Sequence, residues 1–334
     1  MRARLDRRLP SWTLSLVLLS ACEPEPSPEP AWAIGLERGQ EFGALLSVWG
    51  PSPSEVYAVG GNPEAGVMVR FDGAAWRDEA LPANFPLANW VYGVPTGSET
   101  VLWVAGNDGQ VARRGPAGEW TQMDLGTPSA LWGIWGAADD DMWTVGGNIP
   151  GTDPILAHWD GQAWARVTIP ALDREFSALL KVWGTGPTNV FAVGHRGVIL
   201  HYDGQAWTQE LAGTTADIVS LWGTGPAEIV AVGGRSNGMI ARYDGQAWTS
   251  ETIGILPGLN GVWLADDGAG FVVGTDGVAL ELAPGGFEWS LVDRSTRPDT
   301  LHGAFGLSNG SRFGVGGNLM FSPPWTGVIV QLLP

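Results

Sequence analysis

Two residue types that many functions require are nearly absent from this chain, which has one cysteine, Cys22, and one lysine, Lys181. A single cysteine excludes an intramolecular disulfide framework. Proteins that bind nucleic acids neutralise phosphates with a basic surface, whereas this chain has a formal net charge of −17. Composition therefore excludes a disulfide-stabilised scaffold and predicts no nucleic-acid partner.

The apolar stretch near the N-terminus, residues 12–19, is too short to span a bilayer core, which takes about 20 residues. Four arginines precede it, an arrangement typical of a cleaved secretory signal peptide over residues 1–21. The stretch ends in Leu19-Ser20-Ala21-Cys22, which resembles the bacterial lipobox. This resemblance implies cleavage before Cys22 and a lipid attached to its thiol; an ordinary secretory peptide with a chance cysteine is the alternative.

Residues 22–30 alternate proline with glutamate and serine, which predicts an extended, semi-rigid linker. Such a linker would hold a folded domain away from a membrane. We therefore expect a lipoprotein of the cell envelope, anchored in the outer membrane by its lipid and either periplasmic or surface-exposed.

Internal repetition is the strongest signal in the remaining chain, residues 31–334. A triplet of an apolar residue, an aromatic residue and glycine recurs, with Val262-Trp263-Leu264 as the one variant. Its seven aromatic residues are 39 to 48 residues apart: Trp49, Tyr92, Trp135, Trp183, Trp222, Trp263 and Phe305. A second apolar run ending in glycine follows each of them, and a third run follows that.

Four repeats continue from the third run into Asp-Gly-x-x-Trp, first at residues 72–76. Asp-Gly between two β-rich runs predicts a hairpin, because glycine accepts positive φ. Each repeat of about 42 residues thus supplies four strands, A to D, the size of a propeller blade. The seventh repeat ends after its third strand, and Trp32 stands where its fourth would be. The sequence predicts an all-β, seven-bladed propeller whose N-terminal strand completes the last blade.

The Asp-Gly-x-x-Trp hairpin resembles the Asp-box (BNR repeat) of sialidase-type propellers, although the Asp-box has one more residue between Asp and Gly. The chain from residue 31 onward also resembles the repeat-rich lipoprotein propellers of myxobacteria. These resemblances imply a fold and leave the activity open.

Catalytic and metal-binding motifs are not evident in the sequence. Polar strand-C residues such as His158 and His201 alternate with arginine and glutamine in other repeats, which predicts a solvated face and no metal site. The acidic runs at residues 139–141 and 266–267 could hold Ca²⁺, but aspartate is also a common turn residue. We expect no cofactor and no catalytic residue.

Loop lengths differ among repeats mainly between strands B and C and between strands D and A, and these loops emerge on one face of a propeller. Aromatic and acidic residues in or near them are the candidate ligand-binding residues: Trp90, Trp325, Phe176, Asp173 and Glu175. We expect a non-catalytic lipoprotein that binds a protein or carbohydrate through this face. A glycan hydrolase or lyase using Asp173 or Glu175 as acid and base and a purely structural assembly subunit are the alternatives.

Overall fold

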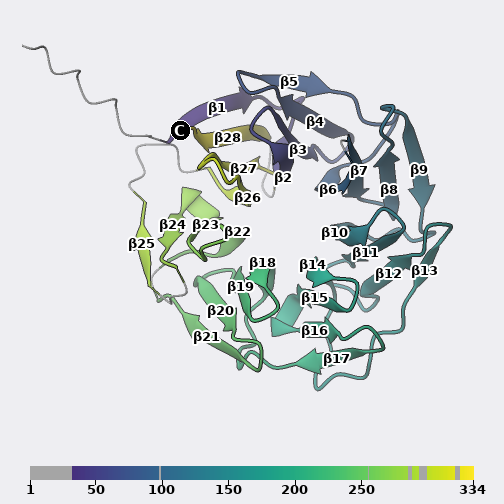
Figure 1. The fold of residues 1–334 in the computed structure, drawn as a ribbon, viewed down its shortest axis with the longest axis vertical. Helices are drawn as coiled ribbons and strands as arrows, with labels where there is room; N and C mark the ends of the chain where they lie inside the picture. Colours follow the sequence, from purple (N-terminus) through teal and green to yellow (C-terminus); the bar gives the residue numbers. More distant parts are fainter. Residues whose placement is uncertain (1–31, 98, 255, 285–287, 293–298, 320–323) are drawn as a thin grey trace, which may run out of the picture. The chain divides into compact units, whose positions relative to one another are not determined.

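The computed structural model describes residues 32–97, 99–254, 256–284, 288–292, 299–319 and 324–334. Cys22 and the expected signal peptide and linker lie outside these residues. The described chain forms 28 strands in seven four-stranded antiparallel sheets, placed around a common axis (Figure 1). The protein is a seven-bladed β-propeller, which confirms the fold predicted from the repeats.

The strands follow the chain blade by blade. Blade 1 contains β2 (Ala44–Ser52), β3 (Glu55–Gly61), β4 (Gly66–Phe71) and β5 (Trp76–Glu79); blade 2 contains β6 (Ala88–Thr96), β7 (Glu99–Gly106), β8 (Gln110–Arg114) and β9 (Trp120–Asp124). Blade 3 contains β10 (Leu131–Ala138), β11 (Asp141–Gly146), β12 (Ile155–Trp159) and β13 (Trp164–Arg166); blade 4 contains β14 (Leu179–Gly186), β15 (Asn189–Gly194), β16 (Ile199–Tyr202) and β17 (Trp207–Glu210). Blade 5 contains β18 (Ile218–Gly225), β19 (Glu228–Gly233), β20 (Met239–Tyr243) and β21 (Trp248–Thr252); blade 6 contains β22 (Leu259–Leu264), β23 (Gly270–Gly274), β24 (Ala279–Leu282) and β25 (Trp289–Leu291). Blade 7 contains β26 (Leu301–Gly306), β27 (Arg312–Asn318), β28 (Thr326–Leu332) and β1 (Ala33–Arg38), and two short 3₁₀ turns, η1 (His195–Gly197) and η2 (Thr275–Gly277), precede β16 and β24.

The ring closes through the N-terminus. Strand β1 pairs antiparallel with β28, so the first strand of the propeller is the outermost strand of its last blade. Trp32, just before β1, packs against Phe271 of blade 6 with ring centroids 5.6 Å apart. A blade built from both ends of the chain lets the ring open only if β1 is released from its sheet.

The Asp-Gly-x-x-Trp hairpins join strands C and D as predicted. In blade 1 the carboxylate of Asp72 accepts hydrogen bonds from the backbone N–H groups of Ala74 and Ala75, both at 2.9 Å. Gly73 takes the positive φ of 93° that this turn requires. The turn places Trp76 opposite Phe71 in the sheet, where the indole is buried. Asp160, Asp203 and Asp244 make the same turn.

The polar strand-C residues are less exposed than the solvated face predicted for them. Most are half-buried, because each lies opposite a strand-B residue that is aromatic in six of the seven blades. His201 stacks on Phe191 with centroids 4.1 Å apart and hydrogen-bonds to Glu210 and Asn189. These side chains cover the strand-B rings and contribute to packing between blades.

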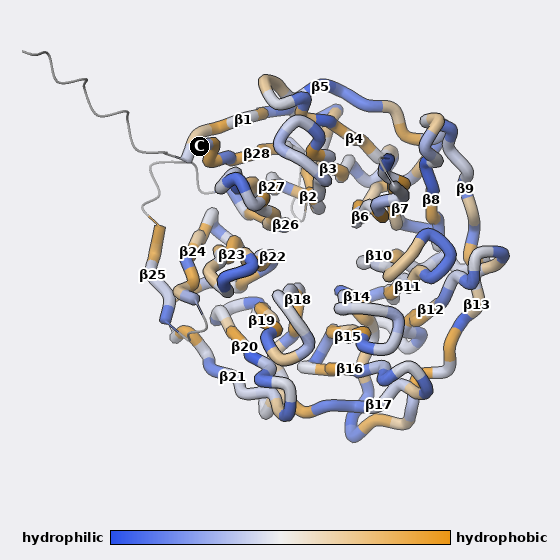
Figure 2. Tube along the Cα trace, viewed as in Figure 1, coloured by the Kyte–Doolittle hydropathy of each residue, from blue (hydrophilic) through white to orange (hydrophobic). Residues whose placement is uncertain are grey.

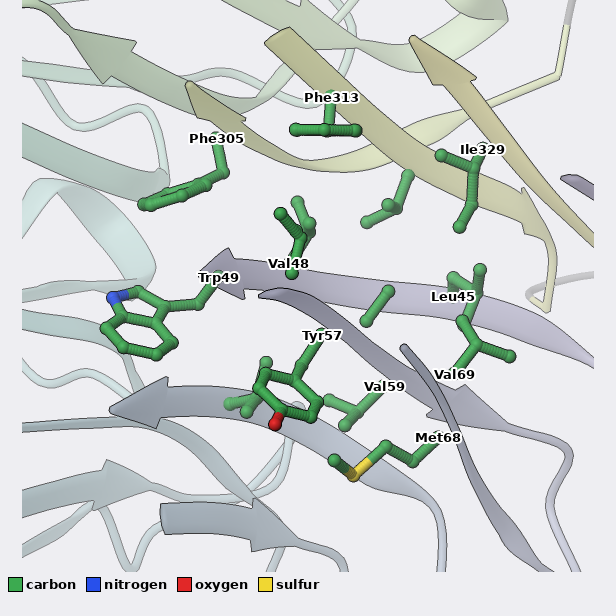
Figure 3. Close-up of a cluster of buried hydrophobic side chains, with 14 of the residues drawn as sticks. Leu45, Val48, Trp49, Tyr57, Val59, Met68, Val69, Phe305, Phe313 and Ile329 are labelled. Carbon is green, nitrogen blue, oxygen red and sulfur yellow. The ribbon is translucent and has the colours of Figure 1, made fainter. Parts of the chain in front are cut away.

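Hydrophobic residues follow the inner strands, whereas the outermost strands β5, β9 and β17 are largely hydrophilic (Figure 2). Between blades 7 and 1 the buried cluster extends along the strands, with Leu45 and Ile329 at one end and Trp49 and Phe305 at the other (Figure 3). Among the residues that the structure describes, no helix is long and apolar enough to cross a membrane.

Candidate functional site

The seven aromatic residues of the repeated triplet form a ring near the end of the innermost strands, and we call this ring the aromatic collar: Trp49, Tyr92, Trp135, Trp183, Trp222, Trp263 and Phe305. Several neighbouring rings are in contact; Trp49 lies 5.9 Å from Tyr92 and 6.3 Å from Phe305 between centroids. Since each ring precedes the turn from strand A to strand B, the collar lies on the face of the A–B and C–D turns. We call this the turn face, and the opposite side, with the B–C and D–A loops, the loop face.

The glycine of the triplet makes room for the collar. A Cβ atom added at Gly93 would lie 2.1 Å from the indole of Trp49 in the preceding blade. The same relation places Trp135 against Gly184 of the next blade, at 2.8 Å. Gly223 and Gly306 receive the rings of Trp183 and Trp263 in the same way. At these four glycines the aromatic-Gly pair is therefore an inter-blade contact in which an indole lies against a backbone without a side chain.

The single variant of the triplet changes the collar at one place. Leu264 stands in blade 6 where the other blades have glycine, so Trp222 of blade 5 has no bare backbone to lie against. Trp222 instead contacts Phe305 of blade 7, with centroids 6.0 Å apart and the rings nearly perpendicular. It is half-buried, whereas Trp183 and Trp263 are buried. Trp222 is thus the collar ring that reaches past the neighbouring blade.

The collar surrounds a mouth with a volume of about 760 Å³ on the turn face. Its rim consists mainly of small, neutral residues of the A–B turns, such as Pro95, Ala137 and Thr185. Among the described residues that line the mouth, Asp266 is the one carboxylate. Burial raises the pKa of the Tyr92 hydroxyl to about 12, so this group stays neutral. The mouth is therefore lined by aromatic rings and small residues and is nearly uncharged.

Beneath the collar, the central wall is built from one residue of each strand A, which is small in five blades: Ser47, Gly133, Ser220, Gly261 and Gly303. Trp90 and Lys181 are the two large residues in this set. The Lys181 amine lies against the ring of Trp90, and Gly133, in the blade between them, adds no side chain. Burial lowers the pKa of Lys181 well below its usual range.

The candidate residues from the sequence lie in separate places. Trp90 lies in strand β6 at the wall beneath the collar, not among the loops. Trp325 is half-buried just before β28 in blade 7, whereas Asp173, Glu175 and Phe176 precede β14 of blade 4. The structure brings only the last three together, and it does not join them to either tryptophan.

Residues 173–175 belong to a charged network on the loop face, whereas Phe176 packs against a buried hydrophobic cluster. Arg174 forms two hydrogen bonds with the carboxylate of Asp173 and donates to the backbone oxygens of Arg196 and Thr214. Hydrogen bonds from Arg174 and Gln209 lower the pKa of Asp173 to about 2. At neutral pH this carboxylate is ionised and already paired, so it cannot supply a proton as a general acid.

The network continues through Asp217, which is the only acidic residue at its position among the seven repeats. Its buried carboxylate accepts the backbone N–H of Arg196 at 2.9 Å and pairs with the guanidinium of Arg235, and His195 lies 3.7 Å away. These residues were not among the candidates predicted from the sequence. The sequence does mark Asp217, because the six equivalent residues in the other repeats are uncharged. Among described residues, no group of three histidine, cysteine, aspartate or glutamate side chains gathers as a metal site.

The collar was visible in the sequence as the repeat signature, and we used it only to count blades. Because the signature recurs at one strand position, closing the ring necessarily gathers all seven aromatic residues around one axis. The variable loops, for which the sequence predicted a binding site, lie on the other face.

Comparison with known proteins identifies the fold and no family. No family model matches the chain, and no curated protein matches it. Among solved structures, YCF48 bound to D1 peptide has a TM-score of 0.64 and 14% identity, covering 91% of this chain and 97% of that one. A catalytically inactive variant of virginiamycin B lyase from Staphylococcus aureus, solved with quinupristin, has a TM-score of 0.70 and 11% identity, covering 92% and 100%. The WD40 propeller domain of Doa1 has a TM-score of 0.65 and 11% identity, covering 90% and 96%.

Proposed function

We propose that this protein is a non-catalytic binding propeller that holds an apolar segment of a partner protein in the mouth of the aromatic collar. The observation that carries this proposal is the mouth itself, an aromatic, nearly uncharged opening of about 760 Å³. Ligand sites in proteins fall in the range of about 300–1,000 Å³ and are lined mainly by apolar and aromatic groups. The volume and the lining of the mouth both fit this description.

The exposure of the rings favours a peptide over a carbohydrate. Sugars stack on open faces of aromatic rings, whereas Trp49, Trp135, Trp183, Trp263 and Phe305 are each at most 9% exposed. Rings packed this closely leave no open face for a sugar to stack on. The structural similarity to YCF48, which was solved with a D1 peptide, supports a peptide ligand.

The enzyme alternative finds less support in these side chains. A hydrolase or lyase that used Asp173 as its acid would need a raised pKa at that carboxylate, and Arg174 lowers it. Lyases do occur among the similar propellers. Turnover assays on any ligand found for the mouth would decide between binding and catalysis.

Anchoring to the cell envelope is part of the same proposal. The lipobox-like sequence before Cys22 and the Pro/Glu linker behind it support a lipid-anchored protein of the outer membrane. We expect wild-type protein to incorporate labelled palmitate in cells and Cys22→Ala protein to incorporate none. Equal incorporation by the two proteins, or none by the wild type, would contradict lipid anchoring at this residue.

Binding can be tested by probing a peptide array and a glycan array with the purified protein. The wild type would be compared with Trp222→Ala, in the mouth, and with Trp325→Ala, a matched tryptophan on the loop face. We expect peptides to bind, with affinity about 30-fold weaker in Trp222→Ala and unchanged in Trp325→Ala. Saturable glycan binding that only Trp325→Ala abolishes would refute the proposal and favour a carbohydrate site on the loop face.

A further inference from the structure

Lys181 is a charged residue type in a position that has no charged counterpart. The equivalent residues in the other blades are serine, glycine or tryptophan. It is also the only lysine in a chain with a net charge of −17. Lysines usually lie on the surface, where their charge contributes to solubility. The single lysine of this chain lies on the central wall instead, so solubility does not explain its presence.

The amine of Lys181 is buried without an opposite charge. The residue is 3% exposed, and no carboxylate of the described chain forms an ion pair with it. Its described neighbour is the face of Trp90. Burying an amine costs free energy unless it is paired, and among the described residues only the Trp90 ring offsets this cost in the free protein.

A small cavity beside this amine shares part of its lining with the mouth. The cavity has a volume of about 20 Å³ and is lined by Lys181, Trp90 and five rings of the collar. The same five rings line the mouth above it: Trp49, Tyr92, Trp135, Trp183 and Trp222. A volume of this size holds about one water molecule, and a carboxylate oxygen needs similar space.

We propose that Lys181 is the group that recognises a carboxylate on the ligand, so that the mouth selects apolar molecules or segments ending in an acidic group. The apolar part lies among the collar rings, and one carboxylate oxygen takes the small cavity beside the amine. This inference rests on the proposed function, since it assigns a ligand class to the same mouth. The unpaired amine carries it: the floor offers one group that becomes a cation beside a carboxylate, and the described chain supplies no anion to it.

Ligand binding should then change the protonation of Lys181. Burial favours the neutral amine in the free protein, whereas a carboxylate at hydrogen-bond distance favours the ammonium form. Tyr92 is the other titratable side chain that lines the cavity, and its pKa of about 12 keeps it neutral throughout. Binding of a carboxylate therefore raises the pKa of Lys181, and protons are taken up at pH values between the pKa of the free amine and that of the bound one.

The test compares 4-phenylbutanoate with its neutral analogue 4-phenylbutanamide by isothermal titration calorimetry in two buffers of different ionisation enthalpy. We expect the acid to bind at least about tenfold more tightly than the amide and to take up a proton that the amide does not. In Lys181→Met, which removes the amine and leaves an unbranched apolar side chain one atom shorter, both differences should disappear. Trp325→Ala, on the loop face, should retain them.

Equal affinities of the two probes for the wild type, or acid binding without proton uptake, would overturn this inference. Because proton uptake is measured on the wild type, the test does not depend on whether Lys181→Met folds. The protein could bind array peptides through Trp222 and yet bind neither probe, or bind both equally. Either result would overturn the role of Lys181 and leave the proposed function standing. Failure of the array experiment itself would instead refute the proposed function.

Discussion

Replacing Gly93 by alanine tests whether the aromatic-Gly pair is an inter-blade contact. The three atoms nearest to the added Cβ all belong to the Trp49 ring, at 2.1 to 2.8 Å. Ordinary contacts begin near 3.4 Å, so the indole has to move by more than 1 Å. Overpacking of this kind costs about 1–3 kcal/mol. We expect Gly93→Ala to lower the free energy of unfolding by that amount in urea denaturation.

A matched control lies in the same ring of turns. Gly186 also lines the mouth, but a Cβ added there has nothing within 4 Å. Gly186→Ala should therefore be neutral or stabilise by about 0.5 kcal/mol through the unfolded state. In a Trp49→Leu background, Gly93→Ala should cost less than in the wild type, giving a coupling energy. Equal stability of Gly93→Ala and Gly186→Ala, or no coupling to Trp49, would refute this account of the triplet.

Three further predictions concern the collar, the loop face and pH. Leu264→Gly provides the backbone without a side chain that blade 6 lacks, so Trp222 should move away from Phe305. The ¹⁹F resonance of 5-fluorotryptophan at position 222 should then shift, and an unchanged resonance would contradict this prediction. Asp217→Asn removes a buried carboxylate and should lower the free energy of unfolding by about 1–3 kcal/mol. Arg235 is the exposed partner of this carboxylate, so Arg235→Ala should lower it by only about 0.5 kcal/mol. Equal losses in the two variants would contradict a central role for Asp217. Burial lowers the pKa of His302 to about 4, so its neutral form favours the folded state and stability falls as pH drops from 6.5 towards 4. His302→Gln should remove about 1–2 kcal/mol of this acid-induced loss, measured as urea midpoints at pH 7 and 4.5, and an unchanged loss would refute it.

The architecture followed from the sequence because blades repeat local rules. The aromatic-Gly triplet, the Asp-Gly turn and the tryptophan after it recur at fixed spacing, and each stands for one contact that the structure contains. The position of Trp32 relative to Trp49 was enough to place the N-terminal strand in the last blade. Each of these features is determined by residues nearby in the chain or in the adjacent blade, so the local sequence is enough to predict it.

The candidate site was harder to predict because it depends on the whole ring. Trp90 was assigned to the loop face as an aromatic exception, but strand A carries its side chain to the central wall. Lys181 was noted as the only lysine, and nothing local indicated that it would meet Trp90 two blades away. The consequence of Leu264 for Trp222 likewise appears only once blades 5, 6 and 7 are placed side by side.

Hydrogen–deuterium exchange with and without a bound array peptide tests the central claim most directly, since it maps the occupied face without any substitution. A ligand in the mouth should slow exchange in the A–B turns at residues 93–96, 136–138 and 184–187. Protection confined to residues 173–177, 195–197 and 234–238 would contradict the account and place the binding site on the loop face.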